Sequence, residues 1–184
     1  MGDIRAFIAV DVPDKLKEKI GMLQCDFSEF NIKPVDPALI HLTLKFLGNV
    51  PEEKIALICD ALDCVECAPF SADICEMGVF PNYKKIRVVW IGAKGNFEKL
   101  QNSVESLLCP LGFEREDRAF SAHFTVARIK KISNKDQALL SERIKKQSKV
   151  NIGKMNVDWI KLKKSTLTPK GPIYEDLYVK ELSS

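Results

Sequence analysis

Two short segments give the strongest indication of how this chain folds: residues 41–48, HLTLKFLG, and residues 123–126, HFTV. Each begins with one of only two histidines, His41 and His123, and each histidine is followed two residues later by a threonine, Thr43 or Thr125. The whole chain holds four threonines, so random placement would rarely produce both pairings. Residues i and i+2 of a β-strand point to the same face. Each segment, as a strand, therefore places a histidine beside a threonine.

The two segments are part of a weak internal repeat. The shift of 82 residues that superimposes His41 on His123 also places Ile4 on Ile86, at the start of an earlier apolar segment. Each half then runs as strand, helix and His-x-Thr strand. Such a repeat indicates two similar units that pack together. We therefore expect a pseudo-symmetric molecule with two α+β lobes.

Hydrophobic periodicity alternates between strand and helix patterns along the rest of the chain. The predicted strands cover residues 4–11, 40–47, 70–79, 85–92, 120–129, 154–166 and 172–181. The predicted helices lie within residues 16–27, 51–62, 97–111 and 133–144. No Pro-, Gly- or Ser-rich linker divides the chain, so residues 1–184 are expected to form one domain with two lobes.

The composition is that of an ordinary globular protein, with 46% hydrophobic and 29% charged residues. No apolar run approaches the roughly 20 residues that span a bilayer, and no signal peptide pattern opens the chain. We expect a soluble cytoplasmic protein that makes no membrane contact. The net charge of +3 is too small to indicate nucleic-acid binding by itself. Lysines concentrate in the last third, where they form either a basic surface for a polyanion or a solvated face.

The six cysteines give only a weak metal signal. Cys64 and Cys67 form the single C-x-x-C pair, and no second close pair or suitably spaced histidine accompanies it. We expect inert reduced thiols, with a zinc site or a redox pair as the alternatives. No metal and no cofactor is therefore predicted.

The two histidines suit acid–base catalysis. Imidazole groups titrate near pH 6.5, so one neutral ring can take a proton from a nucleophile while a protonated ring gives one to a leaving oxygen. The threonine hydroxyls can donate to oxygens that develop charge. This set suits attack at a phosphodiester without a metal ion. The alternatives are that both histidines bind a metal or that they are hydrogen-bonded core residues.

Residues 41–44 and 123–126 resemble the two H-x-T-x signatures of the 2H phosphoesterase superfamily. The surrounding sequence is similar to the LigT-like branch of this superfamily, the RNA 2′,3′-cyclic phosphodiesterases historically called 2′-5′ RNA ligases. The similarity lies in residues 5–11 (RAFIAVD) and in residues 41–48. Residues 163–175 resemble the tail of archaeal members. The resemblance implies a bilobal fold with two antiparallel sheets and flanking helices around a central cleft. It implies metal-independent hydrolysis of a ribose 2′,3′-cyclic phosphate to a 2′-phosphate.

The resemblance also implies roles for the four site residues. His41 corresponds to the proton donor that protonates the leaving 3′ oxygen, and His123 to the proton acceptor that activates water. Thr43 and Thr125 correspond to residues that hold the phosphate. Because the site is nearly symmetric, the residues alone leave the two histidine roles interchangeable.

Arg128 is a candidate substrate contact whose placement needs explanation. It matches an arginine five residues after the second family histidine, which contacts the phosphate or nucleotide. Strict alternation places Arg128 on the face opposite His123, so this role requires a bulge, a twist or reach around the strand end. The alternative is an ordinary surface arginine. The chain also departs from the family at Ala127, where relatives often have glycine.

Three further residues are weaker candidates for substrate binding. Phe7 matches a family aromatic residue and could stack on a base or pack in the core. Lys45 is expected to share the face of His41 and to contact phosphate, or else to be solvated. Tyr174 is expected either to line the cleft or to serve ordinary packing.

The expected partner is RNA with a 2′,3′-cyclic phosphate terminus, with tRNA halves as one candidate, and the chain is expected to be a monomer. Three alternatives stay open. The same chemistry could run as reversible 2′-5′ ligation of RNA ends. The substrate could be a small cyclic nucleotide or an ADP-ribose cyclic phosphate. The protein could also be an RNA-binding module without catalysis, which would leave the paired His-x-Thr segments unexplained.

Overall fold

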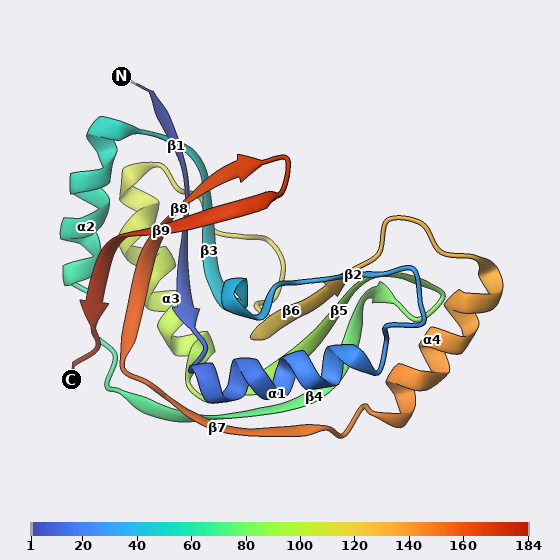
Figure 1. Cartoon of the computed structure of the whole chain (residues 1–184). Coiled ribbons are helices and arrows are strands. Elements are labelled where there is room, and N and C mark those ends of the chain that lie inside the picture. Colours follow the sequence, from blue (N-terminus) through green and yellow to red (C-terminus); the bar gives the residue numbers. More distant parts are fainter. Residues whose placement is uncertain (1, 184) are drawn as a thin grey trace.

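One antiparallel sheet runs through both halves of the chain (Figure 1). The computed structural model describes residues 2–183, and its strand order is β7-β4-β5-β6-β3-β1-β8-β9, with β2 paired to β6. The strands are β1 (Asp3–Asp11), β2 (Lys33–Pro34), β3 (His41–Pro51), β4 (Phe70–Asn82), β5 (Lys85–Lys94), β6 (His123–Arg128), β7 (Asn151–Val157), β8 (Trp159–Thr168) and β9 (Gly171–Glu181). The order is symmetric about the β3–β6 junction, because β1 flanks β3 as β5 flanks β6. The predicted α+β fold is confirmed. The two predicted sheets are present as the two halves of one sheet, joined where β3 pairs with β6.

Four helices cover one face of the sheet. They are α1 (Asp14–Cys25), α2 (Ile55–Asp63), α3 (Phe97–Leu108) and α4 (Asn134–Lys146). Helix α1 follows β1 but packs against β6 and β7, whereas α3 follows β5 but packs against β3 (Figure 1). Each half of the repeat therefore supplies a helix to the other half. No helix within residues 2–183 is both long and apolar enough to cross a bilayer.

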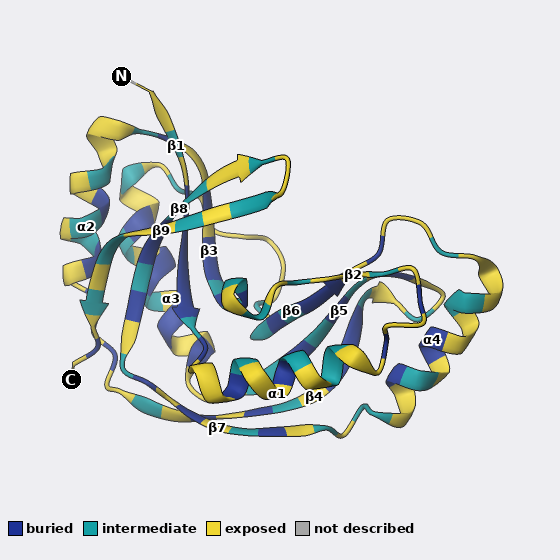
Figure 2. Cartoon of the chain, in the orientation of Figure 1, coloured by how far each residue is buried: buried dark blue, intermediate teal, exposed yellow. Residues whose placement is uncertain are grey.

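The core lies between the helices and the sheet. Leu42 and Phe124 are fully buried there, and α3 contributes an apolar face that includes Leu100 and Val104. Buried segments of the strands and of the helices are dark blue in Figure 2. The helix-covered face takes the alternate residues of each strand. The histidines and threonines of the two motifs therefore lie on the opposite face, here called the open face.

The prediction for the end of the chain is wrong in one respect. The sequence pattern predicts a single strand over residues 154–166, but β7 ends at Val157 and β8 begins at Trp159. Strand β7 pairs with β4 and β8 pairs with β1, so the chain crosses between the two halves at Asp158. Apolar alternation continues through the crossing, so periodicity conceals it. The two-residue strand β2 is too short for any periodic pattern to reveal.

Candidate active site

The two His-x-Thr segments meet where the two halves of the sheet join. Strand β3 pairs with β6 at Leu42 and Phe124. In an antiparallel ladder this register sets His41 across from Thr125, and the other threonine across from the other histidine. Directly opposed side chains have Cβ atoms about 4.5–5.5 Å apart. All four side chains are half-buried, so they form one compact group on the open face.

Each imidazole ring is held by the backbone in the same way. His41 Nδ1 lies 2.8 Å from the carbonyl oxygen of Leu39, and His123 Nδ1 lies 2.6 Å from that of Ser121. A carbonyl oxygen can only accept, so Nδ1 carries the hydrogen and donates it. The neutral ring therefore has its lone pair on Nε2. Nε2 is therefore the ring nitrogen of each histidine that is available to exchange a proton.

The surroundings lower the pKa of both histidines below the usual 6.5. Burial is the largest cause, because it penalises the charged ring. The positive charge of Arg128 lowers both pKa values further, and Lys163 lowers that of His41. The carbonyl hydrogen bonds, and Asp11 beside His41, act in the opposite direction. The site therefore resists additional positive charge until an anion is present.

Aromatic rings fix the position of His41. The ring centroids of Phe7 and Tyr174 lie 4.8 Å and 5.2 Å from that of His41. Phe7 is only 3% exposed, so its ring supports the imidazole and offers no open surface for a base. Phe46, which was not predicted, is 63% exposed and its ring centroid lies 6.3 Å from that of Phe7.

A second aromatic pair supports His123, and the sequence did not reveal it. The ring centroids of Phe80 and Trp90 lie 5.0 Å and 6.4 Å from that of His123. Trp90 lies over Gly78, where any Cβ atom would collide with its indole ring. Gly78 thus permits this arrangement. The sequence pattern does not distinguish Phe80 and Trp90 from core residues, because apolar side chains in β4 and β5 match an ordinary core pattern.

Both motif strands contain a β-bulge directly after the threonine. The β1–β3 pairing skips Leu44, and the β5–β6 pairing skips Val126. These two residues occupy equivalent positions of the repeat. A bulge inserts one extra residue, so the residues that follow it, up to the next irregularity, point to the face opposite to that expected from strict alternation.

The bulge at Val126 brings Arg128 to the open face. The burial pattern changes after Val126, since Ala127 is buried and Arg128 is exposed. The charge of Arg128 acts on both His41 and His123. The sequence pattern required a bulge or twist for Arg128 to share the face of His123, and the bulge at Val126 provides it.

The equivalent bulge sends Lys45 in the other direction, and the predicted face of Lys45 is wrong. Lys45 is 3% exposed and its Nζ lies 2.8 Å from Glu105 Oε1 on α3. The same Nζ donates to the carbonyl oxygen of Glu114 at 2.7 Å. Strict alternation fails at Leu44, so Phe46 takes the open-face position. Lys45 is a buried structural cation, neither solvated nor on the face of His41.

A four-charge cluster lies next to His41. Lys161 and Lys163 each bridge Asp11 and Asp176, with N–O distances between 2.6 and 3.0 Å. Asp11 is the ladder partner of His41 on β1. These lysines belong to the basic last third of the sequence, but their charges are balanced internally. The cluster ties β1, β8 and β9 together beside the site.

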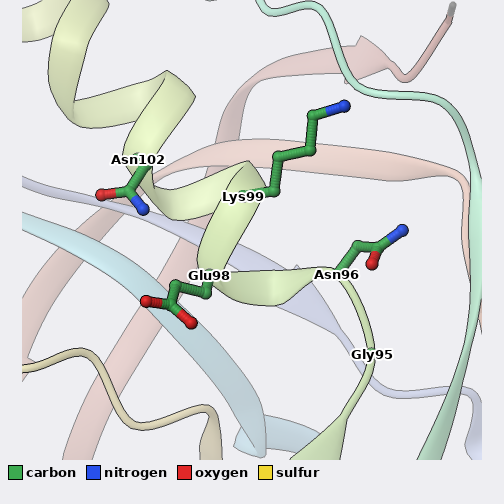
Figure 3. A pocket seen from close by; sticks show the side chains of 5 residues that line it. All are labelled: Gly95, Asn96, Glu98, Lys99 and Asn102. Atoms are coloured by element: carbon green, nitrogen blue, oxygen red, sulfur yellow. The ribbon is translucent and has the colours of Figure 1, made fainter.

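The two most evident surface pockets lie away from the histidines. One, of about 460 Å³, is at the start of α3 and is lined by Gly95, Asn96, Glu98, Lys99 and Asn102 (Figure 3). The other lies beside α1 and includes Gln24 and Pro34. Neither contains a residue of the His-x-Thr motifs. The two His-x-Thr motifs therefore lie outside both of these pockets, on the open face of the sheet.

The thiols and acidic groups of the described chain form no metal centre. All six cysteines are free thiols. Within residues 2–183, no group of three His, Cys, Asp or Glu side chains is arranged to hold a metal ion. Cys64 is exposed and Cys67 is buried just after the end of α2.

Comparisons with known proteins agree with this geometry. The model of the LigT-like phosphoesterase family matches residues 9–90 and 92–174, and each segment contains one His-x-Thr motif. The RNA 2′,3′-cyclic phosphodiesterase of Archaeoglobus fulgidus is 43% identical over 181 residues, which cover 97% of this chain and all of that protein. The protein of the same name from Methanocaldococcus jannaschii is 42% identical over 94% of this chain and 97% of that protein.

Solved structures show the same fold. The TT0787 protein of Thermus thermophilus superimposes with a TM-score of 0.78 at 29% identity, covering 97% of each chain. Escherichia coli LigT, solved in complex with 3′-AMP, gives a TM-score of 0.79 at 23% identity over 99% of each chain. Since the family model matches both halves and the archaeal relatives align over nearly their whole length, this chain belongs to the LigT-like phosphoesterase family.

Proposed function

We propose that this protein hydrolyses RNA ends that carry a 2′,3′-cyclic phosphate and produces 2′-phosphates. The observation that carries the proposal is the convergence of two His-x-Thr pairs, with each Nδ1 bound to a backbone carbonyl so that each Nε2 is the reactive atom. The archaeal relatives bear the name RNA 2′,3′-cyclic phosphodiesterase, which supports this substrate class.

The proposed mechanism is an in-line displacement at phosphorus. Neutral His123 accepts a proton at Nε2 from water as the water oxygen bonds to phosphorus. The bond from phosphorus to the 3′ oxygen breaks, and protonated His41 gives its Nε2 proton to that oxygen. The product is a 2′-phosphate beside a free 3′-hydroxyl. The family resemblance assigns donor and acceptor, because the near symmetry of the site suits either direction.

The threonines and Arg128 would stabilise the negative charge of the reacting phosphate. Thr43 and Thr125 flank the histidines on the open face, where their hydroxyls can donate to non-bridging oxygens. Arg128 adds a permanent positive charge that acts on both rings. A bound anion would counter this charge and raise the pKa of both histidines, which favours the protonated donor.

One reaction tests the proposal directly. The purified, EDTA-treated protein is mixed with an RNA oligomer that ends in a 2′,3′-cyclic phosphate, beside a His123→Ala control. The products are then separated by the position of the terminal phosphate. We expect a 2′-phosphate from the wild type alone. A 3′-phosphate, or loss of activity on chelation, would contradict the proposed scheme.

Ligation of RNA ends is the second candidate, and it uses the same residues. A 5′-hydroxyl in place of water would give up its proton to His123 and form a 2′-5′ linkage. Water is far more abundant, so we expect hydrolysis to dominate. Cyclic-phosphate and 5′-hydroxyl RNA halves, including tRNA halves, would reveal any joined product. Both histidines come from one chain, so we also propose that a monomer suffices, which sedimentation of the active protein would test.

A further inference from the structure

Strand β2 places a second cation beside Arg128. In the β2–β6 ladder Lys33 is the partner of Arg128, and Pro34 is the partner of Ala127. Cross-strand partners point to the same face. Ala127 is buried on the helix-covered face, so Lys33 and Arg128 both lie on the open face. Adjacent strands are about 4.8 Å apart, which brings the two positive groups within reach of one ligand.

The stability of the fold does not explain this like-charge pair. Like charges directly opposite each other destabilise a sheet. Lys33 and Arg128 are both exposed, and no carboxylate oxygen of residues 2–183 lies within 4 Å of either charged group. By contrast, Lys161 and Lys163 nearby are each bridged by two aspartates. The pair on β2 and β6 thus has an unbalanced double positive charge, which suits an anion from outside the chain.

The position of Lys33 relative to the histidines indicates which anion. Strands β3 and β2 pair with the same edge of β6, first at Phe124 and then, four residues further along, at Arg128. That separation is about 13 Å along the strand. A long lysine side chain and one nucleotide can together span it. Arg128 lies across from Lys33 at this level of the ladder, and its charge still acts on the pKa of both histidines.

We propose that Lys33, which lies beside Arg128, binds the phosphate on the 5′ side of the terminal nucleotide. This inference rests on the proposed function, because it takes the cyclic phosphate to lie at the two histidines. The preferred substrate is then an RNA strand or a 5′-phosphorylated nucleotide, and a nucleoside cyclic phosphate without a 5′-phosphate is a poorer one. The phosphate backbone, which every RNA sequence shares, is recognised here without regard to the base.

A binding experiment tests the subsite without any turnover. Calorimetry compares a nucleoside 2′-monophosphate with the matching 2′,5′-bisphosphate. The wild type is expected to bind the bisphosphate more tightly by roughly twofold to fivefold. Lys33→Ala should remove that preference and leave the Kd of the monophosphate unchanged, whereas Lys33→Arg should retain it. Equal Kd values for the two ligands in the wild type would overturn the proposal.

The matched control is Lys15→Ala, which removes the same charge from an exposed position on α1, on the helix-covered side. It should leave the preference for the bisphosphate intact. If Lys15→Ala and Lys33→Ala lose the preference for the bisphosphate to the same extent, the preference depends only on the net charge of the protein, and the proposed subsite is wrong.

Turnover gives a second and separate test. For an RNA strand that ends in a 2′,3′-cyclic phosphate, Lys33→Ala should lower kcat/KM and reduce the slope of log kcat/KM against log salt by about 0.7, the value for one contact with a single strand. For the nucleoside 2′,3′-cyclic phosphate, Lys33→Ala should have no effect. If the wild type hydrolyses no cyclic phosphate, the proposed function fails while the binding comparison still decides the subsite.

Discussion

The side-chain amide of Gln24 on α1 donates a hydrogen bond of 2.7 Å to the carbonyl oxygen of Val126, the bulged residue of β6. The same amide nitrogen donates to the carbonyl oxygen of Val35 at 2.7 Å, just after β2. The other bulge has a similar support, since Glu105 on α3 binds Lys45 directly after Leu44. Each helix that crosses to the opposite half therefore braces the bulge there with a polar side chain.

This brace predicts that Gln24 positions Arg128. Gln24→Leu keeps the bulk but removes both hydrogen bonds, each worth about 1 kcal/mol. We expect kcat/KM to fall several-fold, and we expect the loss to be much smaller when Arg128 is already alanine, because both changes act on the same interaction. A double-mutant cycle on the cyclic-phosphate substrate measures this coupling.

The matched control for Gln24 is Lys19→Met. Lys19 is on the same helix and donates to the carbonyl oxygen of Ile152 at 2.8 Å, on β7 at the far edge of the sheet. Its loss should affect stability without any coupling to Arg128. Additive effects of Gln24→Leu and Arg128→Ala would show that Gln24 has only a structural role.

The buried pair of Lys45 and Glu105 predicts a large effect on stability. Lys45→Met leaves the Glu105 carboxylate buried without its cation, which should lower the free energy of unfolding by about 3–5 kcal/mol. The double variant Lys45→Met/Glu105→Leu should recover much of that loss, because it removes both charges. Denaturant unfolding measures both variants. A selective rise in KM with unchanged stability in Lys45→Met would instead restore a role in phosphate binding.

The dependence of activity on pH follows from the lowered pKa of both histidines. Above both pKa values neither ring can donate a proton from Nε2, and below both neither can accept one. The kcat/KM profile should therefore be bell-shaped with its maximum below about pH 6.5, the ordinary value for histidine. Alanine at His41 or His123 should lower the maximum at least roughly 10²-fold. A rate that rises steadily from pH 5 to pH 9 would exclude the two-imidazole scheme.

The two histidines should respond differently to the loss of nearby cations. Arg128 lowers the pKa of both rings, whereas Lys163 acts on that of His41. Arg128→Gln should raise both pKa values, and Lys163→Met should raise that of His41 while His123 stays near its wild-type value. The chain has only two histidines, so NMR titration of the imidazole signals resolves them and a single His variant assigns them. Equal shifts of both rings in Lys163→Met would contradict the geometry.

The periodicity of apolar residues predicted most of the helices and strands, because both are governed by residues close together in the sequence. The helix predicted from Ser133 onward is present, and the Ser133 hydroxyl accepts from the backbone N–H of Asp136 at 3.1 Å at the start of α4. The spacing of His41 and Thr43, repeated 82 residues later, was sufficient to predict that each histidine lies beside a threonine, because i and i+2 share a face in any strand.

The α+β class, the repeat and the two His-x-Thr pairs could be predicted from the sequence, because helix and strand periods and a two-residue spacing are local properties. The face that each residue takes after the motifs depends on how the strands pair in the folded chain. Arg128 reaches the open face and Lys45 enters the core, and the bulges responsible are defined only by the register of neighbouring strands. Register depends on partners distant in sequence, and for the same reason the pairing of Lys33 with Arg128 and the crossing at Asp158 appear only in the folded chain.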